Sequence, residues 1–171
     1  MLLPVVQSKT GGKVLEDLIR QPKHFIATQQ LTLLMTNYAL GAYIDQIGTN
    51  IGNETKAASL QIGAYIVYDA LWKSALEKKV VLPYVSRETI QSFLPSLHEE
   101  PEWKAEEGKL RDLYLQKIRK ENPTITNILK YVVRNHPDQE ESEYIFFGGA
   151  ITYFLLTRQA EADELKKGFV E

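Results

Sequence analysis

The sequence predicts an all-α protein, folded as a single-domain helical bundle of about five main helices and two short ones. No stretch of alternating polar and apolar residues is long enough to form a sheet. Apolar residues instead recur at helical spacing, and short turns rich in proline, glycine and asparagine separate these stretches. The 171 residues, 44% hydrophobic and 25% charged, are typical of one globular domain, here residues 1–171.

Three helices are expected in the first half, at residues 13–20, 28–47 and 54–79. Thr10-Gly11-Gly12 opens the first helix, which stops near Pro22. The turn at residues 48–53 begins with glycine, the usual signal at the end of a helix, and closes the second. The third ends on two lysines, where the helix dipole favours cations.

The second half begins with an extended linker at residues 80–85. A short helix, capped by Ser86, runs to Leu94 and stops at Pro95. The next helix runs from Pro101, which suits a first helical position, to about Glu121. Another starts at Asn122-Pro123 and ends at His136-Pro137, with one apolar face. The last helix covers about residues 139–166.

The tetrapeptide Gly-Ala-Tyr-Ile occurs twice, at residues 41–44 and 63–66, and residues 148–153 have similar ingredients. Glycine inside a helix costs about 0.5–1 kcal/mol relative to alanine. A close approach of another backbone or of an aromatic ring would offset that cost. We therefore expect Gly41, Gly63 and Gly148-Gly149 at helix crossings, with a ligand pocket as the alternative.

The composition excludes several classes of protein. The chain has no cysteine, which removes disulfides, thiolate zinc sites and cysteine nucleophiles. Residues 25–44 carry no charge, but six threonine, glutamine and asparagine side chains within them favour a buried helix over a membrane span. Met1–Val6 lacks the basic start of a signal peptide, so we expect a cytoplasmic protein with no membrane contact. Ser8–Lys13 resembles a phosphate-binding loop but lacks its first glycine and its final Ser or Thr.

No pattern of catalytic or metal-binding residues is complete. His24, His98 and His136 share no ligand spacing. The acidic pairs Glu140/Glu143 and Glu161/Glu164 resemble those of all-α nucleotide pyrophosphohydrolases, where two helices hold Mg²⁺. On one continuous helix the two pairs would be about 27 Å apart, so a metal site would need a break at Gly148-Gly149. We expect no cofactor, no metal and no catalysis, with a Mg²⁺-dependent hydrolase as the alternative.

Charge is distributed unevenly along the chain. Residues 109–136 contain two acidic residues, Asp112 and Glu121, against seven basic ones, within a chain of net charge −2. The basic residues are Lys109, Arg111, Lys117, Arg119, Lys120, Lys130 and Arg134. We expect Leu110, Leu113, Tyr114 and Ile118 to face inward, which would turn the lysines outward. Cations on an outer helix face can neutralise nucleic-acid phosphates without reading bases. The alternative is a solvated face balanced by its acidic neighbours.

Residues 143–159, EYIFFGGAITYFLLTRQ, combine two aromatic-aliphatic runs, a glycine doublet between them and a polar end. This stretch resembles the C-terminal helical domain of the large subunit of type I CRISPR Cascade complexes, which in some systems is a separate small subunit. The glycine doublet and the acidic residues that follow depart from that pattern.

The resemblance implies a non-catalytic scaffold subunit of an RNA-guided complex. Its expected partners are other subunits, DNA or RNA backbone, and further copies of itself. Such subunits leave sequence reading to the guide. A plain protein-interaction bundle is the third class that the sequence allows.

Overall fold

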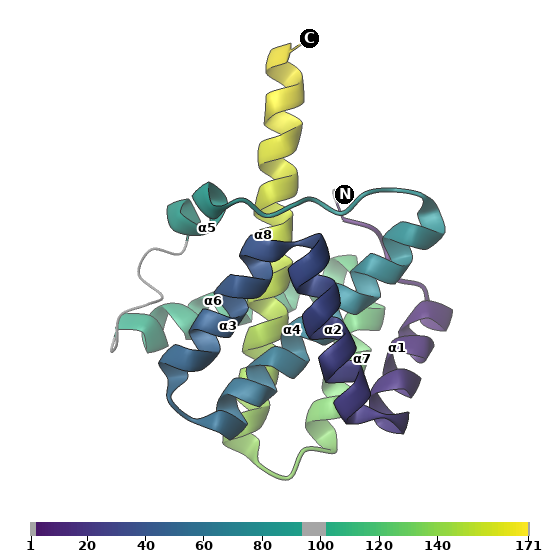
Figure 1. Cartoon of the computed structure of the whole chain (residues 1–171), viewed down its shortest axis with the longest axis vertical. Helices are drawn as coiled ribbons and strands as arrows, with labels where there is room; N and C mark the ends of the chain where they lie inside the picture. The colour runs from purple at the N-terminus through teal and green to yellow at the C-terminus, as the bar shows by residue number, and fades with distance from the viewer. Residues whose placement is uncertain (1–2, 94–101, 171) are drawn as a thin grey trace.

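The computed structural model describes residues 3–93 and 102–170, and within them it contains helices and no strand. This confirms the all-α class, with more helices than the sequence predicted (Figure 1). The described helices are α1 (Ser8–Arg20), α2 (Pro22–Thr36), α3 (Tyr38–Ile51), α4 (Glu54–Lys78), α5 (Arg87–Phe93), α6 (Glu102–Glu121), α7 (Pro123–Arg134) and α8 (Gln139–Val170). Leu94, the expected end of the α5 helix, lies outside the described residues.

The long helix predicted at residues 28–47 is wrong, because two helices meet at Asn37. The φ of −151° and ψ of 65° at Asn37 are not helical. Its buried side chain instead bonds an extended segment near Pro83. Gly41 lies one turn beyond this corner, where a Cβ would sit 3.0 Å from Leu34 Cδ2. Gly41 therefore lets α3 pack closely against α2. This agrees with the helix crossing that the sequence predicted at Gly41.

Helix α1 begins earlier than predicted, at Ser8 rather than Lys13. The two glycines expected to open it lie inside it. Gly11 is buried, and a Cβ there would overlap the side chain of Thr124 on α7. The close contact with α7 explains why glycine is tolerated in this helix.

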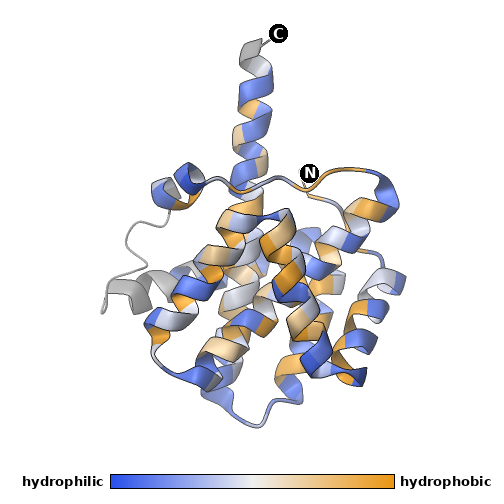
Figure 2. Ribbon diagram, in the orientation of Figure 1, coloured by the Kyte–Doolittle hydropathy of each residue, from blue (hydrophilic) through white to orange (hydrophobic). Residues whose placement is uncertain are grey.

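Helices α4 and α8 form the centre of the molecule. Helix α8 runs through the middle, and its C-terminal turns project beyond the other helices (Figure 1). Apolar residues line the inner faces of the bundle, whereas the projecting end of α8 is mainly hydrophilic (Figure 2). Residues 145 and 147–157 are all buried, as is most of α4 from Leu60 to Leu71. The segment that carried the Cascade resemblance is thus core, and packing alone accounts for its apolar pattern. No described helix combines the length and apolarity needed to cross a membrane.

The crossing of α4 and α8 depends on two glycines. A Cβ on Gly63 would overlap the carbonyl oxygen of Ile145, and a Cβ on Gly148 would overlap that of Leu60. The two backbones are therefore in direct contact, which only glycine permits. This confirms the predicted crossing at Gly63.

These two contacts are equivalent, and they reveal an internal repeat. Gly148 follows Gly63 by 85 positions (148 minus 63), and Ile145 follows Leu60 by the same interval. The ends of α2 and α6, and the starts of α3 and α7 and of α4 and α8, are related by that interval too. In each contact a glycine of one half meets a backbone carbonyl of the other half, and reciprocal contacts of this kind indicate two-fold symmetry. The chain therefore consists of two similar halves packed about a pseudo-two-fold axis between α4 and α8.

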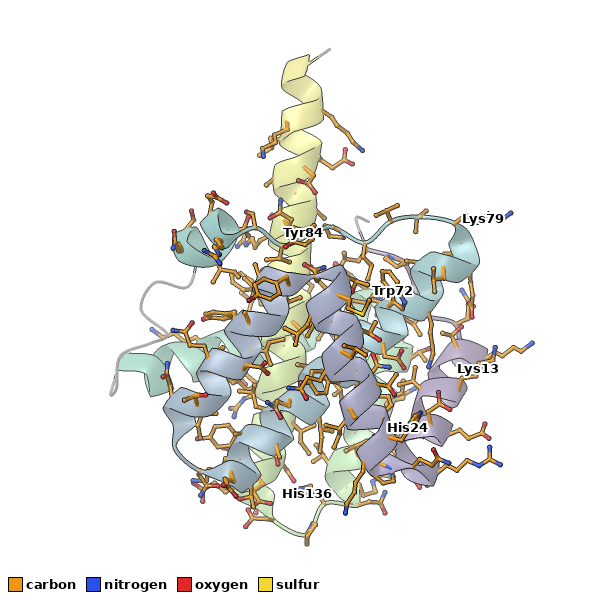
Figure 3. The ribbon with its side chains drawn as sticks, viewed as in Figure 1. Lys13, His24, Trp72, Lys79, Tyr84 and His136 are labelled. Atoms are coloured by element: carbon orange, nitrogen blue, oxygen red, sulfur yellow. The ribbon has the colours of Figure 1, made fainter. Side chains whose placement is uncertain are left out.

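Each half begins with an extended segment that lies on the other half. We call residues 3–6, Leu-Pro-Val-Val, the N-terminal strap and residues 82–85, Leu-Pro-Tyr-Val, the central strap. The leucine and the last valine of both straps are buried. Figure 1 shows the central strap crossing one end of the bundle, and Figure 3 labels Tyr84 within it.

Two buried asparagines hold the straps. The Oδ1 of Asn37 accepts a hydrogen bond from the backbone N–H of Val85 at 2.8 Å, and its Nδ2 donates to the Pro83 carbonyl at 2.9 Å. The Oδ1 of Asn122 accepts from the backbone N–H of Val6 at 2.7 Å, and its Nδ2 donates to the Pro4 carbonyl at 3.2 Å. Each side-chain amide thus forms hydrogen bonds with the backbone of the strap from the opposite half, and these bonds link the two halves.

A buried tyrosine completes each cluster. The Nδ2 of Asn122 donates to the Tyr153 hydroxyl at 3.1 Å, and that hydroxyl donates to Glu121 at 2.9 Å. In the other half, Tyr68 contacts Asn37 and Thr36 in the same way. Burial raises the pKa of both tyrosine hydroxyls. Both phenols therefore stay neutral and can donate these bonds.

We expect Gly63→Ala and Gly148→Ala to lower the free energy of unfolding by similar amounts. The added methyl overlaps a backbone carbonyl that cannot rotate away, and overpacking of this kind costs about 1–3 kcal/mol or more. Urea denaturation measures the change. Gly12→Ala is the control, because Gly12 is exposed in α1 and its Cβ would meet nothing within 4 Å. Equal stability of Gly63→Ala and Gly12→Ala would contradict the backbone contact.

We also expect Asn122→Ala to expose the N-terminal strap and Asn37→Ala the central strap. Each change leaves buried backbone groups without partners, at a cost of about 1–3 kcal/mol. Hydrogen exchange should accelerate at the Val6 amide in the first variant and at the Val85 amide in the second. Asn50→Ala, at an exposed position of α3, is the control. Unchanged protection of Val6 in Asn122→Ala would show that the strap is held otherwise.

Candidate nucleic-acid interface

The seven basic residues predicted as a site all lie on α6 and α7. Lys109, Arg119 and Lys120 are exposed on α6, and Lys130 and Arg134 are exposed on α7. Lys130 and Arg134 are four residues apart and therefore share a helix face. Tyr114 and Ile118 face inward as predicted, at 3% and 0% exposure. Leu113 does not: it is 60% exposed, so the inward face of α6 is narrower than the sequence suggested. The side chain of Leu110 lies outside the described residues.

Two of the seven cations are neutralised by neighbouring acids. Arg111 lies 3.3 Å from Asp112 and 3.7 Å from Glu143 on α8, and its side chain is 25% exposed. Lys117 lies 4.0 Å from Glu121 and packs over the ring of Tyr114. For the other five, no ion pair forms with any acid among the residues that the structure describes. The open positive charge is therefore smaller than the sequence count.

Arg119 and Lys130 meet at a pocket between α6, α7 and α8. The pocket has a volume of about 210 Å³. Its lining consists of Leu115, Gln116, Arg119, Thr126, Leu129, Lys130 and Phe146. Leu129 is fully buried, and Leu115 and Phe146 pack against the core. The pocket thus has an apolar lining and two cations that come from different helices. We call it the basic pocket.

The other half has a pocket that overlaps the equivalent place and has different chemistry. Three of its residues, Gln30, Asp45 and Gln61, correspond to Leu115, Lys130 and Phe146 after a shift of 85 residues. Leu34 corresponds to Arg119. Burial raises the pKa of Asp45, and hydrogen bonds from Gln61 and Gln30 oppose that rise. The same scaffold thus holds an acid and amides in one half, and two cations and apolar groups in the other. The cations are therefore not a requirement of the fold.

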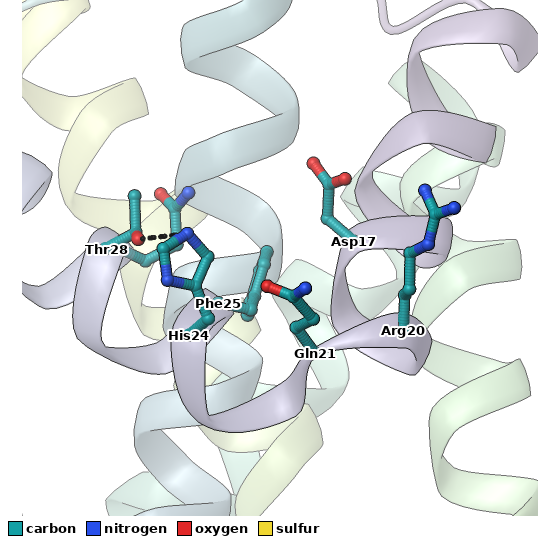
Figure 4. Close-up of a pocket in the computed structure, with 7 residues that line it drawn as sticks. Asp17, Arg20, Gln21, His24, Phe25 and Thr28 are labelled. Carbon is teal, nitrogen blue, oxygen red and sulfur yellow. Dashed lines mark hydrogen bonds between the residues drawn. The ribbon is translucent and has the colours of Figure 1, made fainter.

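A second hollow, about 340 Å³ in volume, lies between α1 and α2 (Figure 4). Figure 4 shows His24 beside Thr28 at 3.5 Å, with Asp17 and Arg20 apart from them on the neighbouring helix. Beneath it, Lys73 bridges Asp17 at 3.1 Å and the buried Asp69 at 2.8 Å. Burial raises the pKa of Asp69, against the effect of Lys73. Asp17 pairs with Lys73, and Arg20 pairs with Glu16. The hydroxyl of Thr28 lies beside the base His24, but at 3.5 Å the contact is long for the activation of a nucleophile.

The acidic pairs considered as a metal site are distributed along one unbroken helix, α8, with no break at Gly148-Gly149. Each acid instead contacts a base: Glu140 with Lys56, Glu143 with Arg111, Glu161 with Arg158 and Glu164 with Lys167. Among the described residues, no group of three or more potential ligands comes together. His24 lies on α2 and His136 lies between α7 and α8, and His98 lies outside the described residues.

The sequence showed the cations but not their arrangement. The pairing of Arg111 depends on Glu143, which only the packing of α6 against α8 brings near. Leu115, Thr126 and Phe146 were missed because each belongs to an ordinary apolar or mixed helix face. The interval of 85 residues was the signal that could have revealed the equivalent pockets.

Comparisons with protein-family models, with curated proteins and with solved structures each gave no match to this chain.

Proposed function

We propose that this protein is a non-catalytic binding subunit that contacts the phosphate backbone of a nucleic acid through α6 and α7. The observation that carries the proposal is the convergence of Arg119 and Lys130, from two helices, on one pocket without an acidic partner among the described residues. Lys120 and Arg134 extend the positive charge along the two helices, and Lys109 adds a cation nearer the start of α6.

Phosphate contact suits these residues better than the two alternative roles for cations. A structural ion pair needs a nearby acid, as Arg111 has in Glu143. A solvated face of this charge would be balanced by neighbouring acids, and Arg119 and Lys130 form no ion pair among the described residues. Exposed arginine and lysine side chains can neutralise phosphates by displacing bound counterions, which makes the affinity depend on salt.

The wider assignment, a scaffold subunit of a Cascade-like RNA-guided complex, is a proposal supported by the resemblance of residues 143–159 alone. It adds other subunits and further copies of the chain as partners. Copies placed side by side would present the basic surface repeatedly along one strand, which raises the effective concentration of weak contacts. Purification from the native host, with sequencing of any bound RNA and identification of bound proteins, tests it. Recovery of the chain without RNA or subunits would refute it.

For the isolated chain, we expect weak, salt-sensitive binding of a fluorescein-labelled 20-nucleotide DNA strand, measured by anisotropy at several salt concentrations. Arg119→Gln with Lys130→Gln should weaken binding and lower the slope of log affinity against log salt by about 1.4–1.8 units for two lost contacts. Oligonucleotides of different sequence should lose affinity alike, because phosphates carry no sequence.

The matched control removes two exposed cations elsewhere, with Lys23→Gln on α2 and Arg87→Gln on α5. It lowers the net charge by the same amount. If both double variants lose affinity equally, binding follows net charge and the α6–α7 interface is wrong. Circular dichroism and urea denaturation check that both variants fold.

A further inference from the structure

The residues that line the basic pocket suit a ligand in which a planar, largely apolar group is attached to negatively charged groups. Leu115, Leu129 and Phe146 supply apolar surface, and the side chains of Arg119 and Lys130 belong to the same lining. Its volume of about 210 Å³ is below the range of about 300–1,000 Å³ usual for pockets that enclose a whole small ligand. The pocket therefore suits one group of a larger molecule.

We propose that the basic pocket receives an unpaired nucleobase, and that the protein therefore binds single strands in preference to duplexes. This inference rests on the proposed function. In a duplex the bases are stacked inside, and only phosphates and groove edges are presented. In a single strand a base can turn outward and pack against an aromatic ring. Phe146 offers such a ring, and Arg119 and Lys130, which line the same pocket, supply cations for the phosphates on either side of that base.

The pocket lining also indicates how selective the site is. Gln116 and Thr126 are its uncharged polar side chains, and neither is buried. Discrimination between bases requires several fixed hydrogen-bonding groups, whereas packing against an aromatic ring accepts every base. The site therefore accepts any base, with little preference for sequence.

The equivalent pocket of the other half offers substitutions that the fold already tolerates. Gln30 and Gln61 occupy there the positions of Leu115 and Phe146. Leu115→Gln with Phe146→Gln thus places the residues of the other half at these two positions, and leaves every charge in place. The matched control is Leu31→Gln, which makes the same change at a position of α2 that is 60% exposed.

The experiment compares three fluorescein-labelled DNA probes by anisotropy: a 12-nucleotide single strand, the same sequence as a duplex, and the single strand with abasic sites. Wild-type protein should bind the single strand about tenfold more tightly than the abasic strand, since packing of one base on an aromatic ring is worth about 1–3 kcal/mol, a factor of about 5 to 150. Leu115→Gln/Phe146→Gln should remove this difference. It should leave the salt slope and the affinity for the duplex unchanged, and Leu31→Gln should alter none of the three.

Failure of this inference is distinguishable from failure of the proposed function. If Arg119→Gln/Lys130→Gln weakens all three probes alike and wild type binds the abasic strand as well as the normal one, the base pocket is wrong and the phosphate contact stands. If no probe binds and a labelled acidic peptide containing phenylalanine does, the site is a protein-docking surface and both are wrong. Because the abasic comparison uses wild-type protein, the test holds even if the double variant fails to fold.

Discussion

The direct contact between the backbones of α4 and α8 is the constraint on which the rest of the structure depends. Because Gly63 and Gly148 have no side chains, each helix axis comes as close to the other as its carbonyl groups allow. The contact is reciprocal, so it fixes a two-fold relation between the halves and not merely a crossing. Helices α2 and α3 then pack on α4 as α6 and α7 pack on α8. The positions of the straps depend on the same relation, because each strap binds an asparagine of the opposite half across this axis.

The two-fold relation also separates what the fold requires from what it does not. Positions that keep the same residue in both halves, such as the asparagines, the crossing glycines and the buried tyrosines, lie in the core or hold the straps. Some positions reverse charge between the halves, among them Asp45 and Lys130, which line the two pockets. The charge at these two positions is therefore not required by the fold.

The helical class and most helix ends were predictable, because spacing and turn residues are local signals. The break at Asn122 was visible, since Pro123 follows it, whereas the equivalent break at Asn37 was not. Its cause is the strap at Pro83–Val85, which is remote in sequence. The internal repeat was not predictable for a related reason: the identical Gly-Ala-Tyr-Ile segments lie 22 residues apart, whereas the two halves repeat at an interval of 85 residues with few identities. For the site, the cations were found, but the apolar residues between them needed the packing of three helices.

The exchange of straps has a consequence for the folding of the chain. A protein in which each half completes the other has the architecture of a homodimer with swapped arms whose two subunits are linked covalently. In two separate chains of that kind, folding would depend on protein concentration, because arm exchange would be bimolecular. The covalent link makes the same exchange intramolecular. It also frees the two copies of each surface position to mutate independently, which identical chains cannot do, and an acidic mouth and a basic one can then coexist on one symmetric frame.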